Sequence, residues 1–94
     1  MTVQDRATRK VIHDFVVSTF LFDSGDVADD ASLIGEGIMD STGVLELITF
    51  VEETFAISVA DEEVLPENFD SIARIAAYVE RKRKGGHRLT EAAS

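Results

Sequence analysis

The chain has 94 residues, which is enough for one domain with a single core. Hydrophobic residues make up 45% of it, too many for a disordered chain, and the absence of cysteine excludes disulfides, thiolate metal sites and a protein thiol nucleophile. The net charge of −9 is unevenly distributed, because residues 11–73 contain 15 acidic residues and no lysine or arginine, whereas the rest of the chain contains 3 acidic and 9 basic residues. A body this acidic disfavours nucleic acid and anionic lipid as partners and favours proteins with basic patches, although it also serves solubility alone.

The first half of the chain reads as a helix followed by a long loop. Apolar residues at the three-to-four spacing of one helical face predict a helix over residues 3–20, with the core stripe Val11, Ile12, Phe15, Val16 and Phe20. Residues 23–40 are rich in glycine and aspartate and predict a loop. We expect its apolar residues to fix it to the core: Val27, Leu33, Ile34 and Ile38.

The second half predicts two more long helices and a short one. The stripe of residues 41–55 is Val44, Leu47, Phe50, Val51 and Phe55, and an extended connector then directs Ile57 and Val59 into the core. A helical turn begins at Pro66, and a last helix covers residues 71–84, with Asp70 or Ser71 as its cap and Gly85-Gly86 as its end. The prediction is an all-α bundle over residues 1–84, followed by a flexible C-terminal tail over residues 85–94.

Sequence signals for membranes, catalysis and metals are missing. No apolar run is long enough to span a membrane, and the polar start lacks the apolar stretch of a signal peptide, so we expect a cytoplasmic protein without membrane insertion. The only histidines are His13, beside the first core stripe, and His87, in the tail, and no nucleophile elbow or zinc motif accompanies them. A calcium loop starting at Asp23 would lack acidic ligands at its third, fifth and twelfth positions.

The pair Asp40-Ser41 stands directly before the second helix. A plain helix cap explains such a pair, because both side chains accept hydrogen bonds from first-turn amides. However, Leu45, Ile48 and Glu52 share a helical face with Ser41, and the core stripe is already filled by other residues. These apolar residues, with an acidic rim of Glu46, Glu52 and Glu53, favour a docking surface beside the serine. A wide core stripe that packs against the long loop is the alternative.

The residues around this pair resemble the acyl and peptidyl carrier proteins. The resemblance begins at Asp40-Ser41, continues through Glu46-Leu47 and through residues 50–57, and extends through residues 61–63 and 66–71 into the last helix. It covers nearly the whole chain and implies an acyl-carrier-protein-like four-helix bundle with a long first loop. Thr42 and Gly43 depart from the leucine and aspartate of many fatty-acid carriers. The loop over residues 34–39 is more similar to that of free-standing carriers that work with adenylating ligases, including aminoacyl carriers.

The resemblance implies a function as a free-standing carrier. Ser41 would be the covalent attachment point of 4′-phosphopantetheine, with Asp40 as its motif neighbour, and the cargo would be held as a thioester. The positions of Leu45, Glu46, Ile48, Glu52 and Glu53 are those that partner enzymes contact in the family. We expect a monomer without catalytic activity of its own. The implied partners are a phosphopantetheinyl transferase, an acyl- or aminoacyl-activating ligase, and an acyltransferase or synthase. The cargo stays open between fatty acyl, as in fatty acid biosynthesis, aminoacyl and polyketide groups.

Two other interpretations remain open at this point. The chain is alternatively an unmodified acidic helical domain for protein interaction, in which Asp40-Ser41 is only a cap, or an acidic metal-binding protein. Basic residues 81–84 predict a solvated helix end that suits the helix dipole, not a nucleic-acid site.

Overall fold

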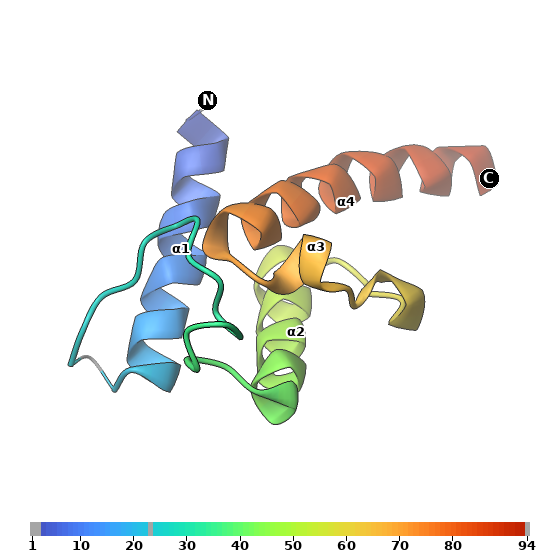
Figure 1. The fold of residues 1–94 in the computed structure, drawn as a ribbon. Coiled ribbons are helices and arrows are strands. Elements are labelled where there is room, and N and C mark those ends of the chain that lie inside the picture. Colours follow the sequence, from blue (N-terminus) through green and yellow to red (C-terminus); the bar gives the residue numbers. More distant parts are fainter. Residues whose placement is uncertain (1–2, 23, 94) are drawn as a thin grey trace.

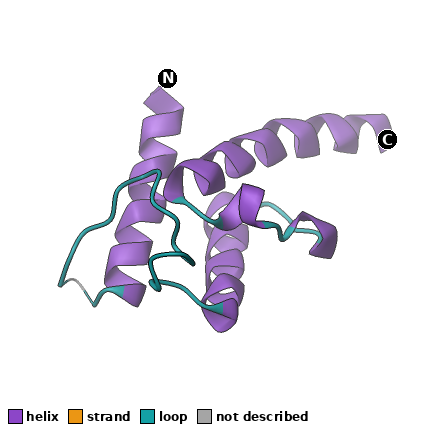
Figure 2. Cartoon of the chain, in the orientation of Figure 1, coloured by secondary structure: helices purple, strands orange, loops and turns teal. Residues whose placement is uncertain are grey.

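The computed structural model of the chain describes the backbone of residues 3–22 and 24–93, and the side chains of residues 6–22 and 24–83. Within these residues the structure has four α-helices, one 3-10 helix and no strand, in the order α1 (Val3–Phe20), α2 (Ser41–Phe55), η1 (Asp61–Glu63), α3 (Pro66–Phe69) and α4 (Ile72–Ala93) (Figure 2). The predicted all-α bundle with a long first loop is confirmed, and α1 and α2 have the predicted bounds. No helix of the described residues combines the length and apolarity of a membrane span.

The core lies where α1, α2 and α4 meet (Figure 1). The fully buried members of the two predicted stripes are Ile12, Val16, Leu47 and Val51, and α4 adds the fully buried residues Ile72, Ile75, Ala76 and Val79. The other stripe residues are partly buried, except for Val11, which is 38% exposed at the edge of the α1 stripe. A row of phenyl rings borders the core, with Phe15 stacked on Phe50 at a centroid distance of 4.0 Å and Phe20 edge-on to Phe15 at 5.9 Å. Aromatic packing therefore joins α1 to α2 on this side.

The loop between α1 and α2 follows the surface of the bundle and is held by some of its apolar side chains. Leu33 is fully buried, and Val27 and Ile38 pack against the core, as predicted. The expectation that Ile34 also fixes the loop is wrong, since its side chain is 49% exposed. The amides of Ile38 and Met39 both donate to the Leu33 carbonyl, so the chain turns back at Leu33 and directs the next residue, Ile34, outward.

The connector between α2 and α3 is extended and then forms the short 3-10 helix η1, which the sequence pattern did not predict. Ile57 and Val59 pack against the core, as expected. The carboxylate of Glu63 holds η1 on α4, because its Oε1 accepts from the Tyr78 hydroxyl and the Lys82 ammonium, each at 3.0 Å. The Ala60 amide is the main cause that lowers the pKa of Glu63, and the Lys82 and Tyr78 donors add to it, whereas burial raises the pKa of Tyr78.

The last helix begins at Ile72, one residue later than predicted, and it also ends later than predicted. Ser71 is its cap, since Ser71 Oγ accepts from the Arg74 amide at 3.1 Å. The prediction that Gly85-Gly86 ends the helix is wrong, because α4 continues to Ala93. A helical glycine costs only about 1 kcal/mol relative to alanine, so a glycine pair permits a helix end without requiring one. The flexibility of residues 85–94 stays a prediction, and the His87 side chain lies outside the described residues.

Candidate functional site

Asp40 and Ser41 have different roles at the start of α2. The backbone of Asp40 is extended, and its Oδ1 accepts from the Gly43 amide at 2.8 Å, which makes Asp40 the cap of α2. Ser41 is the first helical residue, and its side chain is exposed. Within the described residues, the Ser41 hydroxyl has no hydrogen-bond partner. Because the cap bond to the Gly43 amide comes from Asp40, a cap role does not account for the serine.

Close packing at Gly43, two residues further along α2, fixes the position of Ser41. A Cβ atom at Gly43 would lie 2.9 Å from both Met39 Cγ and Phe20 Cε1, closer than ordinary carbon contacts allow. The absence of a side chain therefore lets the first turn of α2 rest directly on the end of α1. The departure from the common carrier sequence at Gly43 thus has a structural reason in this chain.

The loop that leads to Ser41 is anchored by Asp70, which lies between α3 and α4. Its Oδ2 accepts from the Ser32 hydroxyl at 2.6 Å, its Oδ1 accepts from the Ile34 amide at 3.0 Å, and its backbone oxygen accepts from the Leu33 amide at 2.7 Å. A left-handed backbone at Gly37, with φ of 74°, then turns the chain toward α2. Asp70 is therefore a loop anchor, and the other capping candidate, Ser71, caps α4.

The apolar residues of the predicted docking surface differ in exposure. Leu45, one turn after Ser41, is 64% exposed, so it is surplus to the core, as expected. Ile48, one turn further, is half-buried and packs against the core. The face that begins at Ser41 is therefore apolar and accessible mainly through Leu45.

The three glutamates of the predicted rim also differ. Glu46 and Glu53 are exposed, and neither has an ion pair or hydrogen bond with any described residue. Together with Thr49 and the stacked rings of Phe15 and Phe50, they line a shallow hollow of about 370 Å³ between α1 and α2.

Glu52 has a structural partner that no sequence pattern indicated. Its Oε2 accepts from the Val59 amide at 2.9 Å, and the side chain is half-buried. It thereby fixes the connector after α2, and the acids that point to solvent at this surface are Glu46 and Glu53. Sequence reasoning missed this role because a bond from Glu52 to Val59 depends on where the chain turns after the helix.

His13 lies against loop carboxylates. Its Nε2 is 2.6 Å from Asp26 Oδ1, and its Nδ1 is 3.3 Å from Asp14 Oδ1. The hydrogen bond with Asp26 is the main cause that raises the pKa of His13 above 6.5. Its polar contacts in the structure are carboxylates and include no serine, so no serine hydrolase arrangement forms at this residue. Among the described side chains, no three acidic or histidine residues come together as metal ligands.

Comparison with known proteins identifies the family. No family model matches the chain. An acyl carrier protein of Akkermansia muciniphila is 32% identical over 79 residues, which cover 84% of this chain and 96% of the relative. The chain belongs to the acyl carrier protein family.

Other carrier proteins are similar to the chain at comparable levels. An acyl carrier protein of Bdellovibrio bacteriovorus is 30% identical over 73 residues, or 78% of this chain and 91% of the relative. A D-alanyl carrier protein of Abiotrophia defectiva is 38% identical over 53 residues, or 56% of this chain and 67% of the relative. The resemblance seen in the sequence is therefore confirmed, and a carrier role follows from the family.

Proposed function

We propose that this carrier protein holds an acyl or aminoacyl group as a thioester on 4′-phosphopantetheine attached to Ser41, and shuttles it between cytoplasmic enzymes. The observation that carries the proposal is the division of roles at the start of α2. Asp40 caps the helix, so the exposed Ser41 hydroxyl remains available for modification. The names of the relatives refer to acyl and D-alanyl carriers, which supports this range of cargo.

The residues present fit the prosthetic group. Within the described part of the chain, the amides of Ser41 and Thr42 donate to no protein atom, and the positive end of the α2 dipole lies at the same place. Both features favour the negative charge of a phosphodiester on Ser41. The group would supply the thiol that the chain lacks. The chain itself would catalyse nothing, since a transferase would supply the base and metal for the attachment.

The exposed residues of α2 support a docking role. Leu45 would add apolar contact near the arm, whereas Glu46 and Glu53 would attract basic partners such as a phosphopantetheinyl transferase, an activating ligase and an acyltransferase or synthase. Ile48 packs against the core and Glu52 bonds the connector after α2, so both would hold this surface in place. Attraction between exposed charges speeds association more than it slows release, which suits a shuttle.

Intact mass spectrometry tests the attachment. Co-expression with a broad-specificity phosphopantetheinyl transferase should add the mass of one phosphopantetheinyl group to the chain and to a Thr42→Ala control. The Ser41→Ala variant should gain nothing. An unmodified wild-type chain, or a gain that survives Ser41→Ala, would leave the unmodified interaction domain as the better explanation.

Charge reversal tests the docking surface. The double variant Glu46→Lys/Glu53→Lys should slow modification at low salt and weaken its salt dependence. The control Glu62→Lys/Glu67→Lys changes the net charge equally at exposed positions of η1 and α3. Equal rates for the two double variants would contradict a specific role for Glu46 and Glu53.

A further inference from the structure

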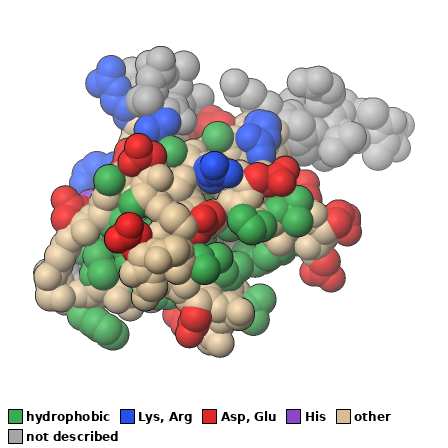
Figure 3. All heavy atoms as spheres, in the orientation of Figure 1, with side chains coloured by type: hydrophobic (Ala, Val, Ile, Leu, Met, Phe, Trp, Pro, Cys, Tyr) green, Lys and Arg blue, Asp and Glu red, His purple; other side chains and the backbone are tan. Residues whose placement is uncertain are grey.

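The lysine and arginine side chains that the structure describes lie toward one end of the molecule. α1 packs against α4, so the basic first half of α1 lies beside the helix that carries the other basic segment. Figure 3 shows the visible lysine and arginine side chains in the half of the molecule where α1 begins. The start of α2, with Ser41, lies at the opposite end in Figure 1. The basic end is therefore separate from the candidate attachment site.

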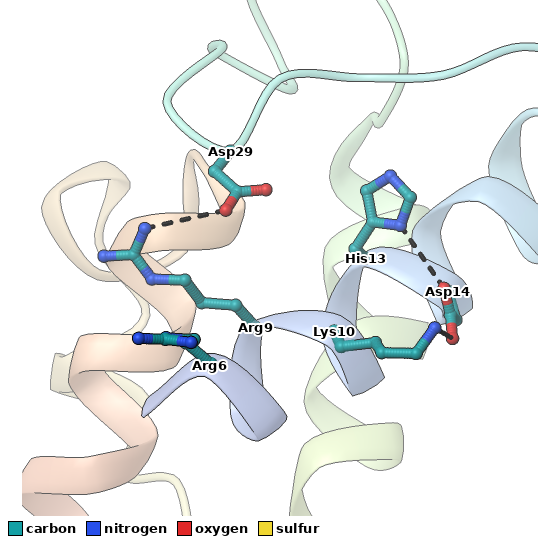
Figure 4. Close-up of a pocket in the computed structure, with 6 residues that line it drawn as sticks. All are labelled: Arg6, Arg9, Lys10, His13, Asp14 and Asp29. Carbon is teal, nitrogen blue, oxygen red and sulfur yellow. Dashed lines mark hydrogen bonds and ion pairs between the residues drawn. The ribbon is translucent and has the colours of Figure 1, made fainter. Parts of the chain in front are cut away.

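A hollow of about 340 Å³ opens at this basic end, beside α1 (Figure 4). Four of its lining residues follow the three-to-four spacing of one helical face, and all four can donate hydrogen bonds. The lining consists of Arg6, Arg9, Lys10, His13, Asp14 and Asp29.

Contacts between α1 and the long loop fix one side of the hollow. Arg9 Nη1 lies 3.5 Å from Asp29 Oδ2, and His13 Nε2 lies 2.6 Å from Asp26 Oδ1. These contacts hold the loop against α1, and they keep the Arg9 and His13 side chains in place. The hollow is thus shaped before any ligand arrives.

The other two basic residues are accessible. Arg6 is exposed and has no ion pair or hydrogen bond within the described residues. Lys10 contacts Asp14 at 3.1 Å, but its side chain is 76% exposed. Exposed ion pairs of this kind contribute little to stability, so the ammonium of Lys10 can exchange Asp14 for a stronger acceptor.

We propose that this hollow binds a phosphate-bearing anion, with Arg6 and Lys10 as its principal donors. The guanidinium of Arg6 presents paired N–H groups that match two phosphate oxygens. Figure 4 shows Lys10 directed away from Arg6 and toward Asp14, so Lys10, one turn away, adds its positive charge to the site when it exchanges Asp14 for the phosphate. The hollow is larger than a phosphate ion, so a phosphate ester fits the space. Two carboxylates line the hollow and oppose an anion at short range, but Asp29 is paired with Arg9 and Asp14 with Lys10. Salt screens the repulsion from the rest of the acidic body beyond about 8 Å at physiological ionic strength.

Titration of the unmodified chain with inorganic phosphate tests the site. Amide chemical shifts of residues 6–14 should change and saturate with phosphate, and should not do so with chloride at the same ionic strength. The variant Arg6→Gln/Lys10→Gln should bind phosphate about tenfold more weakly or not at all, because it removes charged donors. The control Arg74→Gln/Arg83→Gln loses the same charge from exposed positions on α4 outside the hollow and should keep the affinity.

The same variants distinguish the source of the phosphate. If the chain sediments with vesicles that contain phosphatidylglycerol but not with vesicles of phosphatidylcholine alone, the ligand is a lipid headgroup. The Arg6→Gln/Lys10→Gln variant should then lose this sedimentation. Saturable phosphate binding without vesicle binding would assign a soluble phosphate ester. Shifts that chloride reproduces, that never saturate, or that the Arg6→Gln/Lys10→Gln variant retains would overturn the site.

Discussion

Replacement of Gly43 by alanine should destabilise the protein, although the same change in a helix usually stabilises. Helix propensity alone favours Gly43→Ala by about 1 kcal/mol. The structure opposes it, because the new Cβ would lie 2.9 Å from Met39 Cγ and 2.9 Å from Phe20 Cε1. Met39 is only 3% exposed, so it has little room to move. Overpacking of this kind costs about 1–3 kcal/mol, which leaves a net loss of about 1 kcal/mol.

Urea denaturation and thermal melts, each followed by circular dichroism, measure the effect. A loss of about 1 kcal/mol should lower the melting temperature by about 4–8 °C in a domain of this size. Gly25→Ala is a suitable control, because the nearest atom to its new Cβ would be Leu21 Cδ1 at 4.0 Å. A Gly43→Ala protein as stable as the native one would refute the reasoning.

A double-mutant cycle shows which neighbour of Gly43 causes the destabilisation. If the Phe20 ring is responsible, Gly43→Ala should cost less in a Phe20→Ala background, with a coupling of about 1 kcal/mol. No coupling would assign the cost to Met39 alone. In either case the first turn of α2 should shift, which changes the presentation of Ser41.

Three further substitutions should each lower the stability of the protein. Asp40→Ala should lose about 1 kcal/mol of stability in denaturation experiments because α2 loses its cap, and Asp40→Asn should retain most of it. Glu52→Ala should cost about 1–2 kcal/mol, measured in the same way, since it leaves the half-buried Val59 amide without its acceptor. The pKa of His13 is raised above 6.5 in the folded state, so its stabilising interaction with Asp26 is complete below pH 6.5 and is lost as the pH rises through the folded pKa. His13→Gln should therefore be less stable than the native protein in thermal melts under mildly acidic conditions, and equal stabilities there would contradict this assignment.

The main helices could be predicted because their signals are local. In α1 and α2, apolar spacing alone set the bounds, and the buried residues Ile12, Val16, Leu47 and Val51 lie on the predicted stripes. The burial of a residue at the edge of a stripe, such as Val11, could not be predicted, because it depends on which neighbouring element covers that edge. The C-terminal end of α4 was misjudged, since glycine permits a helix end without requiring one.

The candidate site was predictable in its residues and less so in its contacts. Asp40 and Ser41 are adjacent in sequence and share a familiar pattern, but only the structure distinguishes the cap from the exposed hydroxyl. The anchoring of the loop by Asp70 joins residues more than 35 positions apart. No local pattern encodes such a bond, because it depends on how the loop folds back on the junction of α3 and α4.

The separation of charge between the two ends of the molecule has a consequence for encounters in solution. Cations gathered where α1 begins, with an acidic body beyond them, give the protein an electric dipole moment. In the field of a positively charged enzyme, such a molecule experiences a torque as well as an attraction. The torque would turn the end with Ser41 toward the enzyme before contact, so that fewer collisions are lost to wrong orientations.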